Sequence, residues 1–120
     1  MEGNYYESVV LIEPSLGEEE VSKVVDTIKS RIQRYGGEII REEDWGLRDL
    51  AYELNKRRRA YYRIFTVKAP PEFVKSLEDF YRTYEPVFKF VTFKLKKKKL
   101  RAFLESLKGQ QKEGAAQNVQ

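Results

Sequence analysis

Apolar residues alternate between short strand-like segments and longer helix-like segments along most of the chain. Residues 5–12 (YYESVVLI) are aromatic and β-branched, and Pro14 follows them, so this segment predicts a β-strand. Residues 21–35 repeat apolar side chains at helical spacing, which predicts an amphipathic helix. Gly36 and Gly37 come directly after it and provide its C-terminal stop.

The start of this first helix has two candidate caps. Ser15, with Glu18 three residues later, and Gly17 can each serve as the N-cap. The acids at positions 18–20 stand where a helix N-terminus favours negative charge. A metal site would need these carboxylates to converge, but successive helical positions point in different directions. We therefore expect helix-start electrostatics here and no metal site.

Four more elements follow. Residues 38–50 predict a second strand, bent at Trp45-Gly46, and residues 60–69 predict a third, with a basic loop between them. Two prolines at positions 70 and 71 stop the third strand and pre-set the first turn of a second helix. The apolar face of that helix consists of Phe73, Leu77, Phe80, Tyr81 and Tyr84. Residues 87–95 predict the fourth strand.

The element order β-α-β-β-α-β is that of a ferredoxin-like α+β fold. Such a fold has a four-stranded antiparallel sheet with two helices on one face, which leaves the other face open and the second and fourth strands at the edges. We assign residues 1–97 to one ferredoxin-like domain. Residues 98–120 form a basic C-terminal extension, expected to be a short helix followed by a disordered tail.

Composition excludes several classes of function. The chain has no cysteine and no histidine, which removes thiolate nucleophiles, zinc cages and imidazole acid/base chemistry. It also lacks a glycine-rich phosphate loop, a stretch of about 20 apolar residues that could span a membrane, and a secretory signal. We expect a protein that is not an enzyme, needs no cofactor and stays where it is made.

Charge is distributed unevenly. Residues 1–50 contain 12 acids and 6 bases, whereas residues 51–120 contain 7 acids and 17 bases. Concentrated positive charge favours a polyanionic partner, because each cation that neutralises a phosphate releases a counterion. A solvated, solubilising surface is the other interpretation of such charge runs.

The candidate phosphate-binding residues lie in the basic loop between the second and third strands and toward the C-terminus. The predicted RNA-binding residues are Arg48, Lys56, Arg57, Arg58, Arg59, Lys89, Lys94, Lys96, Lys97, Lys98, Lys99 and Arg101. Four aromatic residues near them, Tyr61, Tyr62, Phe88 and Phe90, are more typical of a core or a protein interface than of base stacking. Trp45 is expected to anchor packing at the strand bend.

One segment resembles a known family. Residues 45–54 (WGLRDLAYEL) are similar to the W-G-[KR]-R-x-L-A-Y-x-I block of the sixth protein of the bacterial small ribosomal subunit. Tyr6-Glu7 in the first strand, Pro14 before the acidic helix start and the YGGE sequence at 35–38 agree with that family. The resemblance covers residues 5–97.

The resemblance implies a structural protein of the cytoplasmic ribosome with no enzymatic role. Its implied partners are the central domain of small-subunit rRNA and the eighteenth protein of the small subunit. Two positions depart from the family pattern: Asp49 stands where many members carry a second base, and Lys89 stands where an arginine is usual. The lysine keeps the charge but loses the bidentate fork of arginine.

Two other functions are possible on the same fold. An acylphosphatase-like hydrolase would need an arginine-containing anion loop after the first strand, but residues 13–18 (EPSLGE) are acidic there. A protein-only adaptor that uses the open sheet face is the second alternative, and the salt dependence of RNA binding separates it from an RNA-binding protein.

A protein partner is expected at the edge formed by the second strand, because an unpaired edge must be blocked or used. The predicted partner-binding residues are Ile39, Ile40, Glu42, Glu43 and Trp45. Together with Asp44, the two glutamates would prevent self-association while they attract a basic partner, so the free chain is expected to be a monomer.

Composition also predicts high thermal stability. Glu, Lys and Arg are abundant, whereas the chain has one methionine, no cysteine and few amides, as in proteins of thermophiles. The isolated chain should therefore melt above the usual mesophile range of roughly 45–65 °C in a thermal scan. A midpoint inside that range would contradict the prediction.

Overall fold

The computed structural model describes residues 4–96, 101, 102 and 105. The elements in order are β1 (Asn4–Ile12), α1 (Glu18–Arg34), β2 (Glu38–Leu54), β3 (Arg57–Ala69), α2 (Phe73–Arg82) and β4 (Val87–Lys94). This confirms the predicted β-α-β-β-α-β order. Residues 101, 102 and 105 have helical backbone. The rest of the predicted short helix and tail lies outside the described residues.

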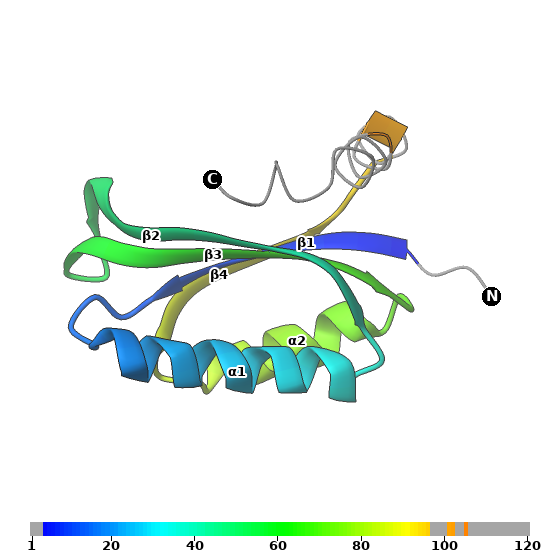
Figure 1. The fold of residues 1–120 in the computed structure, drawn as a ribbon, viewed down its shortest axis with the longest axis horizontal. Coiled ribbons are helices and arrows are strands. Elements are labelled where there is room, and N and C mark those ends of the chain that lie inside the picture. The colour runs from blue at the N-terminus through cyan, green and yellow to red at the C-terminus, as the bar shows by residue number, and fades with distance from the viewer. Residues whose placement is uncertain (1–3, 97–100, 103–104, 106–120) are drawn as a thin grey trace.

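All strand pairs are antiparallel, and the sheet order is β2-β3-β1-β4. β2 and β4 are therefore the edge strands, as predicted. Both helices lie on the same side of the sheet (Figure 1). Side chains alternate between the two faces along each strand, so Val10, which is buried in the core, faces the helices. Leu11 then faces away from them, on what we call the open face.

The core lies between the helices and the covered face of the sheet. Its helical part consists of Val21, Val24, Val25, Ile28 and Ile32 from α1 with Phe73, Leu77, Phe80 and Tyr81 from α2. The predicted apolar face of the second helix is thus confirmed except for Tyr84, which lies past the end of α2 and packs against the core from there. Inside the core the hydroxyls of Ser8 and Tyr81 are hydrogen-bonded at 3.0 Å. Burial raises the pKa of Tyr81, so its hydroxyl stays protonated.

The N-terminal end of α1 shows which of the two candidate residues is the N-cap. Gly17 is the N-cap, and its amide donates to Oε1 of Glu20 at 3.0 Å. At the other end Gly36 takes a φ of +92°, the left-handed conformation that glycine adopts without strain. The Gly37 amide then donates to the carbonyl of Ile32 at 2.8 Å. The prolines at 70 and 71 precede α2 in a turn and do not form its first helical turn.

The prediction of a basic loop between the second and third strands is wrong. β2 continues to Leu54 and β3 begins at Arg57, so only Asn55 and Lys56 connect the two strands. Their φ values of +49° and +67° are those of a two-residue hairpin turn. The consecutive arginines that follow this turn therefore alternate between the two faces of a strand. The bend at Trp45-Gly46 is confirmed, because the β2–β3 register shifts between Asp44 and Gly46.

The close approach of chain segments at Gly37 yields a stability prediction. A Cβ atom there would lie 2.7 Å from Val67 and 2.9 Å from both Ile32 and Phe73. Gly37→Ala should lower the free energy of unfolding by about 1–3 kcal/mol in denaturant titrations, because the core must shift to admit a methyl group.

The control for that substitution is Gly17→Ser. Gly17 has a φ of −79°, and a Cβ atom there would come no closer than 4.0 Å to Glu20. Serine is also a favoured N-cap, so this variant should be as stable as the parent or slightly more stable. Equal stability of the two variants would refute the proposed crowding at Gly37.

Candidate nucleic-acid interface

Three of the predicted RNA-binding cations lie on the open face. Lys89 pairs in register with Leu11 of β1, and Arg48 of β2 pairs with Ala60 of β3. Arg58 stands two positions before Ala60 on the same strand and so shares its face. All three are exposed, and none forms an ion pair with a carboxylate of the described residues. Their charges are available to an anionic partner.

The other lysines are distributed over the hairpin tip and the end of β4. Lys56 is exposed in the two-residue turn, and Lys94 and Lys96 are exposed at the end of β4 and just beyond it. Arg101 is exposed in helical backbone. The predicted contacts of Lys97, Lys98 and Lys99 lie outside the described residues.

Arg57 and Arg59 have carboxylate partners within the chain. The Arg57 guanidinium donates to Oε1 of Glu13 through Nε at 2.9 Å and through Nη2 at 2.5 Å. It also donates to the carbonyl of Asn55 at 2.6 Å and lies over the Phe88 ring, 4.7 Å from its centroid. Arg59 donates to Asp49 at 3.1 Å. Phosphate would have to compete with these carboxylates.

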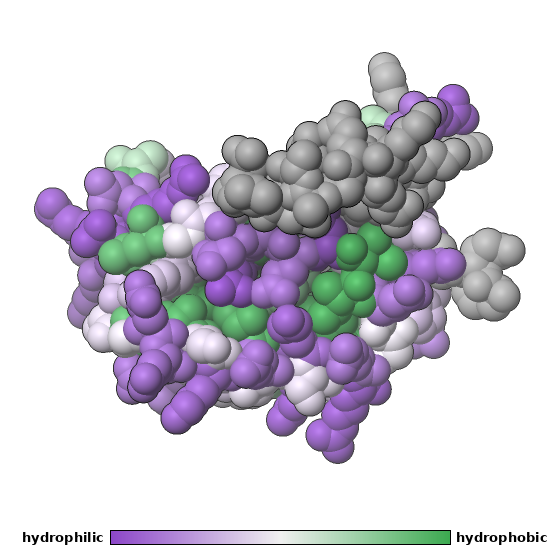
Figure 2. All heavy atoms as spheres, viewed as in Figure 1, coloured by the Kyte–Doolittle hydropathy of each residue, from purple (hydrophilic) through white to green (hydrophobic). Residues whose placement is uncertain are grey.

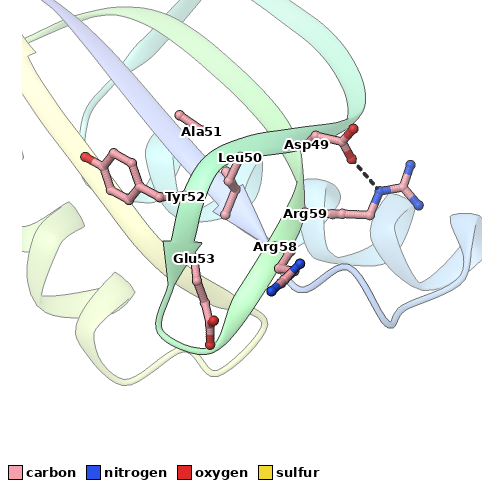
Figure 3. A pocket seen from close by; sticks show the side chains of 7 residues that line it. All are labelled: Asp49, Leu50, Ala51, Tyr52, Glu53, Arg58 and Arg59. Atoms are coloured by element: carbon pink, nitrogen blue, oxygen red, sulfur yellow. Dashed lines mark hydrogen bonds and ion pairs between the residues drawn. The ribbon is translucent and has the colours of Figure 1, made fainter.

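An open concavity of about 570 Å³ lies beside the hairpin tip (Figure 3). Its lining residues are Asp49, Leu50, Ala51, Tyr52, Glu53, Arg58 and Arg59. Figure 3 shows Asp49 joined to Arg59, while the Arg58 guanidinium has no partner among the residues drawn. The departure from the family pattern at position 49 therefore places an acid where it pairs with Arg59.

Trp45 packs against neighbouring side chains at the bend in β2 and also remains exposed. Its ring stacks on Tyr62 with centroids 6.2 Å apart, and Arg48 lies 5.1 Å from the Trp45 ring centroid. The Arg48 Nε also donates to the Trp45 carbonyl at 3.0 Å. These contacts hold the Arg48 guanidinium close to the sheet.

The remaining aromatic residues near the basic clusters also have partners inside the molecule. Phe90 packs against Tyr81 with ring centroids 5.1 Å apart. The Tyr61 hydroxyl donates to the carbonyl of Leu16 at 3.1 Å. Together with Tyr62 against Trp45 and Phe88 beneath Arg57, all four rings serve packing, which agrees with the sequence interpretation.

The β2 edge carries acids that already hold arginines and a lysine. Glu42 accepts from Lys29 at 3.0 Å and also pairs with Arg63, while Glu43 accepts from the indole nitrogen of Trp45 at 3.0 Å. Ile39 packs against the core. Of the five predicted partner-binding residues, Trp45 is the most open, with 44% of its surface exposed.

A groove of about 410 Å³ separates this edge from the start of α1. It is lined by Glu18, Val21, Ser22, Asp44, Gly46, Leu47, Tyr61 and Arg63. Figure 2 shows apolar residues gathered in a band between β2 and α1, with hydrophilic residues on both sides. The side chains of Leu47 and Asp44 are exposed here, so the groove offers apolar surface beside a carboxylate.

Comparison with known proteins agrees with this architecture. The family model described as ribosomal protein S6 matches residues 5–94 of the chain. The chain belongs to the ribosomal protein S6 family. Small ribosomal subunit protein bS6 of Phocaeicola vulgatus is 37% identical to it over 94 residues, which are 78% of this chain and 82% of that protein.

Two further similarities support the assignment. Small ribosomal subunit protein bS6 of Helicobacter acinonychis is 37% identical over 95 residues, covering 79% of this chain and 67% of that protein. The crystal structure of 30S ribosomal protein S6 from Thermotoga maritima superposes with a TM-score of 0.77 at 28% identity. That superposition covers 89% of this chain and 97% of the other.

Membership in the S6 family confirms the broad function expected from the sequence. The chain is a structural, non-enzymatic constituent of the small ribosomal subunit in the bacterial cytoplasm, where it binds rRNA. The hydrolase alternative is thereby excluded. No helix in the described part of the chain is long and apolar enough to cross a membrane.

Two residues that shape the interface were not predicted from the sequence. Glu13 was considered only as part of the loop after the first strand, yet its carboxylate holds Arg57, 44 residues away. Asn55 was not considered at all, although its side-chain amide donates to the carbonyl of Phe88 at 3.1 Å. An asparagine between two strand-like segments is a signal for a tight hairpin and could have identified the turn.

Proposed function

We propose that the open face of the sheet and the tip of the β2–β3 hairpin bind the phosphate backbone of the central domain of small-subunit rRNA. We propose further that the eighteenth protein of the small subunit binds along the β2 edge. The observation that carries the RNA proposal is the placement of Arg48, Arg58 and Lys89 on one face without carboxylate partners among the described residues.

The N-terminal end of α1, on the opposite side of the molecule, is unsuited to RNA. α1 begins with three exposed acids at positions 18–20, and both helices cover that side of the sheet. A phosphate backbone is repelled by this end of α1 and attracted by the unpaired cations of the open face. The charge distribution therefore orients the protein on RNA before any specific contact forms.

The β2 edge suits a basic protein segment. An edge strand offers unpaired backbone groups, and the neighbouring groove offers Leu47 beside the Asp44 carboxylate, whose side chain is 60% exposed. A partner that places an apolar side chain next to a lysine or arginine would match this chemistry. Glu42 holds both Lys29 and Arg63, whereas Asp44 pairs with Arg63 alone and is more exposed, so we expect Asp44 to supply more of the attraction than Glu42.

Salt dependence provides the test of RNA binding. When affinity for a central-domain rRNA fragment is measured against salt concentration, each lost phosphate contact should reduce the log–log slope by about 0.7 to 0.9. Arg58→Ala should therefore flatten the slope by about one unit. Replacing Arg48, Arg58 and Lys89 together should flatten it by about two units or more.

The matched control is Arg34→Ala, which removes one exposed arginine from the last turn of α1 on the side away from the open face. Its slope should equal that of the parent chain. Equal slopes for Arg34→Ala and Arg58→Ala would refute RNA binding by the open face. A parent chain that binds this rRNA fragment with no salt dependence would contradict binding through phosphate neutralisation.

Partner binding at the β2 edge is tested with two aromatic substitutions. Trp45→Ala removes the exposed edge aromatic and should weaken binding of the eighteenth protein roughly tenfold or more, as for a buried interface aromatic. Tyr52→Ala removes a ring that is 78% exposed near the hairpin tip and should leave the affinity unchanged. Calorimetric titration of each variant with the eighteenth protein measures these affinities. A loss of affinity in Tyr52→Ala but not in Trp45→Ala would place the partner elsewhere.

A further inference from the structure

The β2–β3 hairpin is longer than the strand beside it. β1 ends at Ile12, where it pairs with Tyr61, whereas β3 begins four residues earlier, at Arg57. The last part of the hairpin therefore has no neighbouring strand on the β1 side. An isolated two-stranded ribbon is at best marginally stable in water, so some other contact must hold this tip in place.

Two contacts hold the tip across the end of β1. The Arg57 guanidinium binds Glu13, which follows β1, and the Asn55 side chain donates to the Phe88 carbonyl in β4. The Glu13 amide in turn donates to the carbonyl of Pro86 at 2.8 Å, just before β4 begins. Segments around residues 13, 55 and 87 are thus connected in one small cluster.

Each of the three nitrogens of the Arg57 guanidinium donates a hydrogen bond inside this cluster. Its Nε and Nη2 groups bind one carboxylate oxygen, Nη1 binds the Asn55 carbonyl, and the guanidinium lies over the Phe88 ring. Only 32% of the Arg57 side chain is exposed, and 22% of that of Glu13. A partly buried pair in which two N–H groups donate to one charged oxygen is stronger than an exposed ion pair.

The cluster brings together cations that are far apart in the sequence. Asn55 is bonded to Phe88, so the exposed Lys56 and Arg58 on the tip are held near the exposed Lys89 of β4. Without the cluster, Lys56 and Arg58 would lie on a tip that moves relative to Lys89. A phosphate backbone that contacts all three would then have to immobilise the tip on binding.

We propose that Glu13 and Arg57 form a latch that fixes the hairpin tip against β4, so that Lys56, Arg58 and Lys89 present one preformed RNA-binding surface. Arg57 is in this proposal a positioning residue that does not contact phosphate. The proposal rests on the proposed RNA binding by the open face.

The latch and a direct phosphate contact predict opposite results for Glu13→Ala. Removal of an acid that holds Arg57 would free this arginine and strengthen RNA binding if charge alone mattered. If Glu13 holds the latch, the variant should instead bind a central-domain rRNA fragment about threefold to tenfold more weakly, because the competent tip conformation is less populated. The log–log salt slope should stay unchanged, since the number of phosphate contacts is the same.

Glu53→Ala is the matched control. It removes one exposed acid from the same hairpin, and Glu53 has no ion pair with a described residue. This variant should bind RNA as tightly as the parent chain or more tightly. Amide hydrogen exchange should be faster at residues 55–58 in Glu13→Ala and unchanged there in Glu53→Ala.

Arg57→Lys provides a second, independent measurement. Lysine keeps the positive charge and can contact a phosphate, but it cannot reproduce the fork that binds Glu13. The latch predicts a loss of affinity similar to that of Glu13→Ala, whereas a direct phosphate contact predicts nearly unchanged affinity. RNA binding by Glu13→Ala that equals or exceeds that of the parent overturns the latch, and so does unchanged affinity of Arg57→Lys. Absence of RNA binding by the parent chain would instead overturn the proposed function.

Discussion

Packing of both helices against a single face of a four-stranded sheet is the constraint on which the rest of the structure depends. The apolar stripes of α1 and α2 need a continuous apolar surface, and alternate residues of all four strands contribute to one. Neither α1 nor α2 then covers the other face (Figure 1), and the two edge strands keep unpaired backbone groups. Both proposed binding surfaces lie on regions that this packing leaves uncovered.

The unequal lengths of the strands create a second requirement. β2 and β3 extend past the end of β1, and backbone pairing alone does not anchor that extension to the rest of the sheet. The Glu13–Arg57 pair and the bond from Asn55 to Phe88 supply the anchor. In the proposed latch, the contacts that stabilise the hairpin also position its cations, so local stability and the proposed RNA recognition depend on one cluster.

Much of the fold follows from local sequence signals. Helical spacing over residues 21–35, the glycines at 36 and 37 and the bend at Trp45-Gly46 all correspond to features of the structure. The prediction was wrong at residues 51–59, where the polarity of a run of basic residues indicated a loop and the structure has two paired strands. The φ values of Asn55 and Lys56 show that the turn needs only two residues.

The site was harder to predict than the fold. Charge alone identified Arg57, Arg58 and Arg59 as equivalent, but strand alternation gives each a different environment. Arg57 meets Glu13, which lies 44 residues earlier, and Arg59 meets Asp49 across the hairpin. Contacts of this kind depend on the register of the strands, and no short segment of the sequence contains that information.

The most direct test of RNA binding by the open face is amide chemical-shift mapping of the labelled chain during titration with a central-domain rRNA fragment. Shifts should concentrate at residues 48, 56, 58 and 89 and their open-face neighbours, while the outer face of α1 remains unchanged. Shifts concentrated on α1 with none on the open face would contradict this account.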